Sequence, residues 1–283
     1  MIRKSHKLLT AKRMIKLIET RLILVLALAS TLVMTANIAE ARHLKLYTYD
    51  IPEVGVTQAT YTFDRISDPK AGYKSGNPTL HEVEIERTIT EHWLQSFYVD
   101  YDYAPPTDGK TQISEVSSLK TEFNFTFSEK GRQFADFRLN IELAKAMNNK
   151  ISAYGERGMA DTAEFRFIFE KNFDKFTIVL GPMLVKDIAG PGELSGWTYG
   201  YANAILIDIS DRVGFGLEFH GSMGEANNLG FAVRQNHTIV PNFDIAVTRD
   251  LTLSLGAGFG LTNVTDNFTF RTAIQYVFGP GGS

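Results

Sequence analysis

Three glutamates spaced two residues apart are the first group in this 283-residue chain that could carry out chemistry. In an extended strand, Glu82, Glu84 and Glu86 would lie on one face, about 6.5 Å apart. Carboxylates this close could act as a general acid and base, or could bind a metal ion together with His81. His81 falls on the opposite face, however, and a tight metal site needs three or four convergent ligands. We therefore predict no metal site here, but a wet, negatively charged surface.

Glu218 and His220 also share one strand face, which is the start of a hydrolase site. A serine hydrolase would need a nucleophilic serine beside the histidine. The sequence has no Gly-x-Ser-x-Gly motif and neither the Asn-Ser nor the His-Ser signature of barrel lipases and lipid A deacylases. We predict no catalytic residue and no cofactor.

The remaining charges of interest fall on the same polar faces, which gives two interpretations. In the first, they form a network along a water-filled lumen and tune its selectivity. In the second, they form salt bridges that close and stiffen a narrow barrel, because like charges on adjacent strands need partners. Both interpretations place them inside the barrel. The candidate residues are Glu82, Glu84, Glu86, Lys120, Glu122, Arg138, Glu142, Glu164, Arg166, Glu170, Glu218, His220, Asp244 and Arg271.

The last hairpin shows most clearly the elements that must position these residues. Alternate residues from Phe268 to Phe278 form an aromatic and aliphatic face, and those between them form a mainly polar face. Leu251 to Leu261 alternates apolar residues with threonine, serine and glycine. The wall of a water-filled barrel tolerates such small residues, whereas a packed soluble core does not normally leave three alternating glycines. The final strand resembles the C-terminal signal through which the barrel assembly machinery recognises outer-membrane proteins.

The same period of two recurs in about twelve segments, an even number that is typical of bacterial outer-membrane barrels. Short connections rich in Asp, Asn, Gly and Ser alternate with longer ones. We therefore predict an all-β fold, a closed antiparallel transmembrane β-barrel with short periplasmic turns and longer external loops. The predicted strands are Val54–Phe63, Leu80–Thr88, Trp93–Tyr103, 119–127, 137–143, 163–170, 175–184, 197–207, 213–220, 237–247, 251–261 and 268–278.

Aromatic residues gather near the predicted strand ends. They fit girdles at the two membrane interfaces, or alternatively a stacking platform for a ligand at the mouth of the barrel. The residues are Trp93, Tyr101, Tyr103, Phe127, Trp197, Tyr199, Tyr201 and Phe278.

The first 41 residues read as a signal peptide. A basic region precedes the apolar run Leu22 to Met34, which is short for a membrane anchor, and the Ala39-Glu40-Ala41 spacing suits cleavage after Ala41. Translation could begin at Met1 or at Met14. Residues 42–283 then form the barrel, with 22 basic and 30 acidic residues. This negative charge argues against nucleic acid as a partner. Residues 43–52 show no period, and we expect them to be a periplasmic lead-in.

Several short motifs resemble an outer-membrane barrel family labelled meta-pathway of phenol degradation, also called transporter. They are the Glu-rich strand, a Thr-x-x-Trp turn at 90–93, Leu-Lys-x-Glu-Phe at 119–123, Gly-Pro at 181–182 and Gly-Ala-Gly-Phe-Gly-Leu-Thr at 256–262. The resemblance covers roughly Val54 to Phe278, and the tail after Phe278 departs from it. It implies a channel for small, often hydrophobic or aromatic, solutes, with outer-membrane lipid as the surroundings.

Two other functions remain open. One is a structural barrel with a plugged lumen. The other is a soluble periplasmic β-barrel that binds a ligand, with its apolar faces pointing inward. About twelve strands of about ten residues suit an apolar band about 25 Å tall, whereas soluble ligand barrels usually close at about eight strands.

Overall fold

The computed structural model describes residues 45–67, 77–105, 112–147, 160–190, 196–225 and 235–279. Within these ranges the chain forms antiparallel strands joined by turns and loops. None of the described residues belongs to a helix long and apolar enough to cross a membrane. The predicted signal peptide, residues 1–41, lies outside the described residues.

The strands follow one another around the sheet almost in chain order. They are β1 (Thr57–Ser67), β2 (Thr79–Thr90), β3 (Trp93–Ala104), β4 (Ile113–Thr126), β5 (Asp136–Ala146), β6 (Asp161–Asn172), β7 (Thr177–Leu180), β8 (Pro182–Ala189), β9 (Trp197–Ser210), β10 (Val213–Glu225), β11 (Asn236–Ala246), β12 (Leu251–Gly260) and β13 (Phe268–Phe278).

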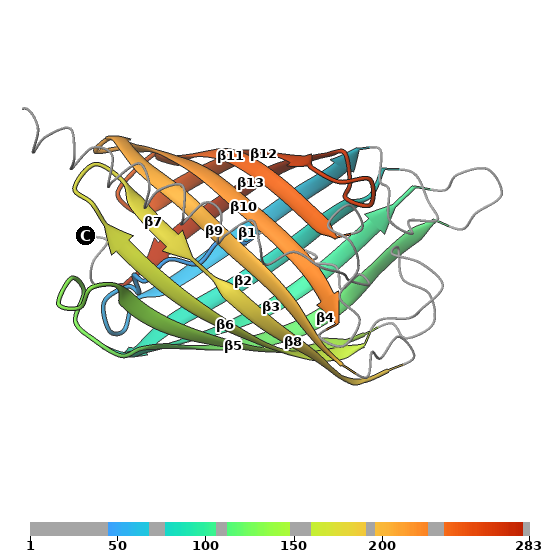
Figure 1. The fold of residues 1–283 in the computed structure, drawn as a ribbon, viewed down its shortest axis with the longest axis horizontal. Helices are drawn as coiled ribbons and strands as arrows, with labels where there is room; N and C mark the ends of the chain where they lie inside the picture. The colour runs from blue at the N-terminus through green and yellow to red at the C-terminus, as the bar shows by residue number, and fades with distance from the viewer. Residues whose placement is uncertain are drawn as a thin grey trace, which may run out of the picture. The chain divides into compact units, whose positions relative to one another are not determined.

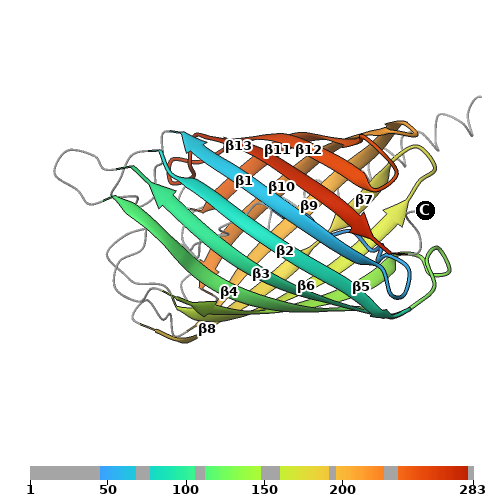
Figure 2. The same cartoon turned by 180° about the vertical axis from the view of Figure 1, so that it is seen from behind.

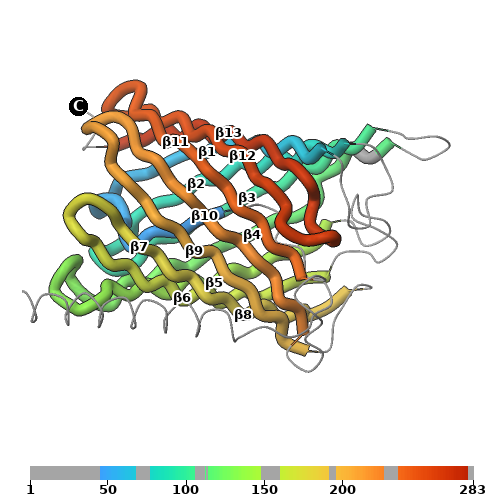
Figure 3. The backbone as a smooth tube through the Cα atoms, turned by 45° about the horizontal axis from the view of Figure 1, so that its top comes forward, coloured from blue at the N-terminus to red at the C-terminus, as the bar shows by residue number. Residues whose placement is uncertain are grey.

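The sheet closes on itself because β1 pairs with both β2 and β13, from Thr57 opposite Phe278 to Ser67 opposite Phe268. Closure leaves no free sheet edge, which is the condition for strands to cross a membrane. Figures 1 and 2 show the resulting barrel from two sides, and Figure 3 shows the oblique course of its strands. The predicted closed antiparallel barrel is confirmed.

β7 and β8 form a single barrel strand interrupted at Gly181. Both pieces pair with β6 on one side and with β9 on the other. A Cβ atom at Gly181 would lie 2.5 Å from the carbonyl oxygen of Ala202, so the two backbones approach too closely for a side chain. The Gly181 N–H donates to Asn203 Oδ1 at 3.0 Å. The barrel therefore has twelve strands around its circumference, as predicted.

The barrel is apolar outside and polar inside. The outward side chains of Ile85 and Phe97 are 52% and 61% exposed, whereas inward Glu84 and Arg138 are only 4% and 5% exposed. Phe270, on the last strand, is 40% exposed. This arrangement reverses that of a soluble protein, in which large apolar side chains are mostly buried. It agrees with the predicted orientation, with apolar faces outward and charged faces inward.

Aromatic rings stack along the outer surface at both ends of the strands. At the end with the shorter turns, Phe137 stacks on Phe127 at 5.2 Å and on Phe169 at 5.1 Å between ring centroids. At the other end, His81 contacts Tyr61 and Tyr101. Outward rings at both strand ends favour the interpretation of membrane-interface girdles over that of a ligand platform. They also place His81 on the outer face, opposite the glutamates, as predicted.

Several strand boundaries differ from the prediction; for example, β4 begins at Ile113 rather than at residue 119, and β10 extends to Glu225 rather than to residue 220. β1 continues to Ser67, so Asp64, which we expected in a loop, lies within a strand and is buried. The connection after β4 covers residues 127–135. Lys130 in this connection pairs with Asp50.

We predict that Val99→Arg destabilises the barrel in lipid vesicles by about 2–4 kcal/mol, the cost of arginine on a lipid-facing strand near the bilayer midplane. Val99 lies on the outer face between Val83 and Leu119. Unfolding by urea would measure the effect. The control is Phe134→Arg, since Phe134 is 88% exposed in the connection between β4 and β5. Equal stability of the two variants would contradict a lipid-facing position for Val99.

Candidate functional site

The candidate site is the barrel lumen, into which all fourteen predicted charged residues point. They come from alternate positions of β2, β4, β5, β6, β10, β11 and β13. The strands bring these residues together because side chains two positions apart share one face of a strand. The inward residues are Glu82, Glu84, Glu86, Lys120, Glu122, Arg138, Glu142, Glu164, Arg166, Glu170, Glu218, His220, Asp244 and Arg271.

Several of these side chains form ion pairs inside the lumen. Lys120 Nζ lies 2.6 Å from Glu82 and 3.3 Å from Asp100. Glu164 accepts a hydrogen bond from Arg166 at 2.5 Å, and Glu218 lies 2.6 Å from the His220 ring. Lys120 thus links β4 to β2 and β3 from inside the wall, as expected for charges that stiffen a narrow barrel. The other two pairs lie within one strand each, β6 and β10.

Arg271 and Asp64 form the most regular pair. The guanidinium of Arg271 on β13 donates from Nε at 2.8 Å and from a terminal nitrogen at 2.9 Å to the two oxygens of Asp64 on β1. Such two-point geometry fixes the relative position of the partners as well as neutralising them. The pair joins the first and last strands, where the barrel closes.

We name residues 45–53 the N-terminal segment, and its first part, residues 45–49, lies inside the lumen. Tyr47 is buried against Ile168, Val179 and Ala204, which are inward residues of β6, β7 and β9. The prediction that residues 43–52 form a periplasmic lead-in is therefore wrong for the described part. The physical reason is that the wall offers Tyr47 an apolar patch among charged groups, a non-local contact that shows no period in the sequence.

Polar contacts also hold the start of the N-terminal segment. Lys45 Nζ lies 2.8 Å from Glu84 Oε2 and donates to the Tyr98 hydroxyl at 2.7 Å. The Tyr47 hydroxyl donates to Glu122. The guanidinium of Arg166 donates to the Lys45 carbonyl at 3.1 Å and lies 4.3 Å from the centre of the Tyr47 ring. Charges of the wall are thus satisfied by the chain's own N-terminal segment.

The backbone of the N-terminal segment is held just as closely further along. Arg138 donates to the carbonyl oxygens of Thr48 and Asp50, at 2.9 and 3.0 Å. The Tyr49 N–H donates to Glu170 at 2.7 Å, and the Tyr49 hydroxyl donates to the Ser128 carbonyl. An irregular backbone inside a membrane barrel needs such partners because its polar groups have no sheet to join.

Lys45 remains charged in this environment. Burial lowers the pKa of Lys45, but attraction by the carboxylates of Glu84, Glu122 and Glu82 outweighs it, so that the pKa lies above its ordinary value. The pKa of Lys130, in the 127–135 connection, is also raised. Partial burial lowers the pKa of Lys130, but the hydrogen bond to Asp50 and the charge of Glu170 raise it by more. Both lysines therefore hold the N-terminal segment by charge.

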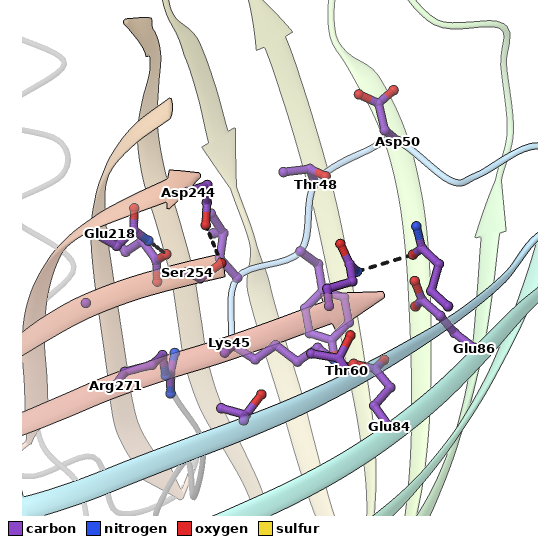
Figure 4. A pocket seen from close by; sticks show the side chains of 18 of the residues that line it. Lys45, Thr48, Asp50, Thr60, Glu84, Glu86, Glu218, Asp244, Ser254 and Arg271 are labelled. Carbon is purple, nitrogen blue, oxygen red and sulfur yellow. Dashed lines mark hydrogen bonds and ion pairs between the residues drawn. The ribbon is translucent and has the colours of Figure 1, made fainter. Parts of the chain in front are cut away.

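The N-terminal segment leaves part of the lumen open. A cavity of about 560 Å³ lies between residues 45–52 and the wall of β1, β2 and β10–β13. Its charged lining consists of six carboxylates and three basic groups, so the cavity is acidic. Figure 4 shows Lys45 on the N-terminal segment, with Glu84 and Glu86 on one side of the cavity and Glu218 and Asp244 on the other.

Sequence reasoning missed several inward residues. Ser96, Tyr98 and Asp100 lie two positions apart on the same, buried face of β3. This period of two could have identified Tyr98 and Asp100 as inward residues. Asp64 was hidden by ending the first strand too early. Lys45 and Tyr47 carried no comparable signal, because an irregular segment has no period that tells which way a side chain points.

The described residues do not contain a group of three or more His, Asp or Glu side chains that could hold a metal ion. His220 contacts Glu218, and no serine is placed beside it by a described hydrogen bond. With this arrangement, the lumen can bind charged or polar groups.

Comparisons with known proteins agree on the fold. No family model and no curated protein matches the sequence. An outer-membrane channel from Pseudomonas putida F1 is similar in structure, with a TM-score of 0.64 and 11% identity over 86% of this chain and 100% of the other. The KdgM porin in complex with disordered oligogalacturonate has a TM-score of 0.51, 12% identity and coverage of 78% and 99%.

The NanC porin has a TM-score of 0.50 and 10% identity over 78% of this chain and 98% of the other. At these identities the likeness concerns the fold alone. The fold is that of bacterial outer-membrane β-barrels of the channel and porin type.

We predict that Asp64→Asn lowers the free energy of unfolding by about 3 kcal/mol, because it leaves the Arg271 guanidinium without its charged partner. The double variant with Arg271→Gln should lose less than the sum of the two single variants. Chemical unfolding of all four proteins in one detergent would give the coupling energy. Strictly additive losses would show that the pair does not stabilise barrel closure.

We also predict that Glu170→Ala increases the rate of amide hydrogen exchange at Tyr49 by at least about tenfold, because the amide loses its acceptor. Exchange measured by mass spectrometry on residues 45–53 would detect the change. Glu218→Gln, on the opposite side of the cavity, should leave it unaltered. A fast Tyr49 amide in the unmodified protein would mean that the N-terminal segment does not stay in the lumen.

Proposed function

We propose that the protein is an outer-membrane channel through which small solutes pass, and that its N-terminal segment narrows the lumen. The observation that carries this proposal is the cavity of about 560 Å³ between that segment and the acidic wall. Lipid-facing apolar side chains enclose this polar space, which is the arrangement of a membrane pore. The N-terminal segment belongs to no strand, so it can move without opening the sheet.

The membrane orientation is part of the same proposal. Cleavage after Ala41 would leave a mature N-terminus close to Lys45. The shorter turns lie at one end of the barrel, together with the start of β1 and the end of β13. We assign this end to the periplasm. The strand Phe268–Phe278 would be the element bound by the barrel assembly machinery. Its aromatic side chains point outward, where such a partner can reach them.

The acidic lining favours solutes that carry a positive charge, because six carboxylates outnumber three basic groups around the cavity. The fourteen inward charged residues would set this preference as well as link the strands. The resemblance to the family labelled meta-pathway of phenol degradation suggests hydrophobic or aromatic solutes. A small organic molecule with both an apolar body and a charged group satisfies both arguments.

A structural barrel with a plugged lumen is the second candidate. The contacts of Lys45, Tyr47 and Tyr49 with the wall favour it, because they fix the N-terminal segment at several points. A soluble periplasmic ligand-binding barrel fits less well. Its apolar faces would have to point inward, whereas Ile85, Phe97 and Phe270 are exposed on the outer surface.

We predict that replacing residues 45–53 by a glycine-serine segment of equal length increases single-channel conductance several-fold in planar bilayers. The enlarged lumen should conduct potassium better than chloride. Replacing Glu82, Glu84 and Glu86 by glutamine in this background should reduce the cation preference.

The matched control changes Glu129 and Arg132, an exposed ion pair in the 127–135 connection, to glutamine, and should alter neither property. Folding of each variant can be checked from its heat-dependent mobility on a denaturing gel. If the folded glycine-serine variant is electrically silent, the plugged structural barrel is the correct interpretation.

A further inference from the structure

The ammonium group of Lys45 occupies a site that is built for a cation. Its Nζ lies 2.8 Å from Glu84 Oε2 and 4.2 Å from the centre of the Tyr98 ring. The Tyr47 ring lies 4.9 Å from the same nitrogen. A carboxylate combined with aromatic faces is the usual means by which proteins recognise organic ammonium groups.

The occupant of this site is separable from the wall. Glu84 and Tyr98 belong to β2 and β3, whereas Lys45 belongs to the N-terminal segment, which pairs with no strand. The cavity beside the N-terminal segment reaches Lys45 and Glu84. A solute in the cavity can therefore approach the same carboxylate that holds the lysine.

Glu86 adds a second negative group to this side of the cavity. It lies two positions after Glu84 on β2 and faces the same space. Among the described residues its carboxylate has no hydrogen bond or ion pair, whereas Glu82 is paired with Lys120 at 2.6 Å. Glu86 is half-buried and its carboxyl group faces the cavity, so a cation bound there could pair with it directly.

We infer that the cavity binds a small organic solute bearing a primary ammonium group, with Glu86 and Glu84 as its acceptors, and that this solute competes with Lys45. The inference rests on the proposed channel function and specifies its solute class. The ammonium would donate to the two carboxylates, and its organic body would extend into the cavity beside the aliphatic side chain of Leu206. Lys45 thus acts as an internal substitute for the solute while the N-terminal segment is in place.

The test is isothermal titration calorimetry of the full mature barrel in detergent with n-butylammonium chloride. Three other probes are matched to it. Butanol lacks the ammonium group, butyrate carries the opposite charge, and potassium chloride lacks the organic body. We expect saturable binding of butylammonium only. Binding of potassium chloride with equal affinity would overturn the assignment, since it would show a general acidic surface.

Three variants locate the site. Glu86→Gln should weaken butylammonium binding by at least about tenfold, because a charge-assisted hydrogen bond is lost. Lys45→Met should strengthen binding several-fold, because it removes the internal competitor. Glu129→Gln, in the exposed 127–135 connection and outside the cavity, should change the affinity less than twofold. Circular dichroism would verify that each variant keeps its strands.

An unchanged affinity in Glu86→Gln, or no gain in Lys45→Met, would overturn the inference. Calorimetry tests the ammonium site and conductance tests the channel function, so each proposal can be contradicted without the other. A conducting protein that ignores butylammonium remains a channel but loses this site. A silent protein that binds butylammonium at Glu86 loses the channel function, and with it the reading of that ligand as a transported solute.

Discussion

The need to neutralise charge inside a closed wall is the constraint on which this structure depends. Closing twelve strands places alternate side chains in a confined lumen, and the sequence fills those positions with Glu, Asp, Arg and Lys. A buried charge without a partner is costly, so the lumen must supply partners or water. Strand-to-strand pairs such as Arg271 with Asp64 meet part of this need. The N-terminal segment meets another part, with Lys45 at Glu84 and its backbone at Arg138 and Glu170.

The same constraint explains why the N-terminal segment lies where it does. It contacts the wall of β2–β7 and β9 and leaves its other side to the cavity. Tyr47 contributes apolar burial and Lys45 contributes charge, so two different forces fix neighbouring residues. Stiffening of the barrel and selection of a solute are then compatible roles for one set of side chains, because the charges that hold the N-terminal segment also face the space beside it.

The strands of the barrel wall could be predicted from the sequence, whereas the N-terminal segment inside the lumen could not. A period of two is a local property, so it reveals strands, their inward faces and the position of residues such as Glu84 and Arg138 before any contact is known. Strand ends are less certain, and Asp64 was assigned to a loop because the polar residues after Phe63 resemble turn chemistry. The N-terminal segment has no period. Its place depends on partners more than 100 residues away, such as Arg166, which local reasoning cannot supply.

This distance in sequence has a consequence for how the molecule assembles. Lys45 and Arg166, which meet in the lumen, are separated by 121 residues, and Arg271 and Asp64, which join the seam, by 207. Contacts of high sequence separation form slowly, because a long loop must close first. The N-terminal segment therefore meets its partners only after the chain has formed strands as distant as β6. Until β6, β7 and β9 are in place, Leu46 and Tyr47 lack the apolar patch against which they pack, so seating of the N-terminal segment is a late step in folding.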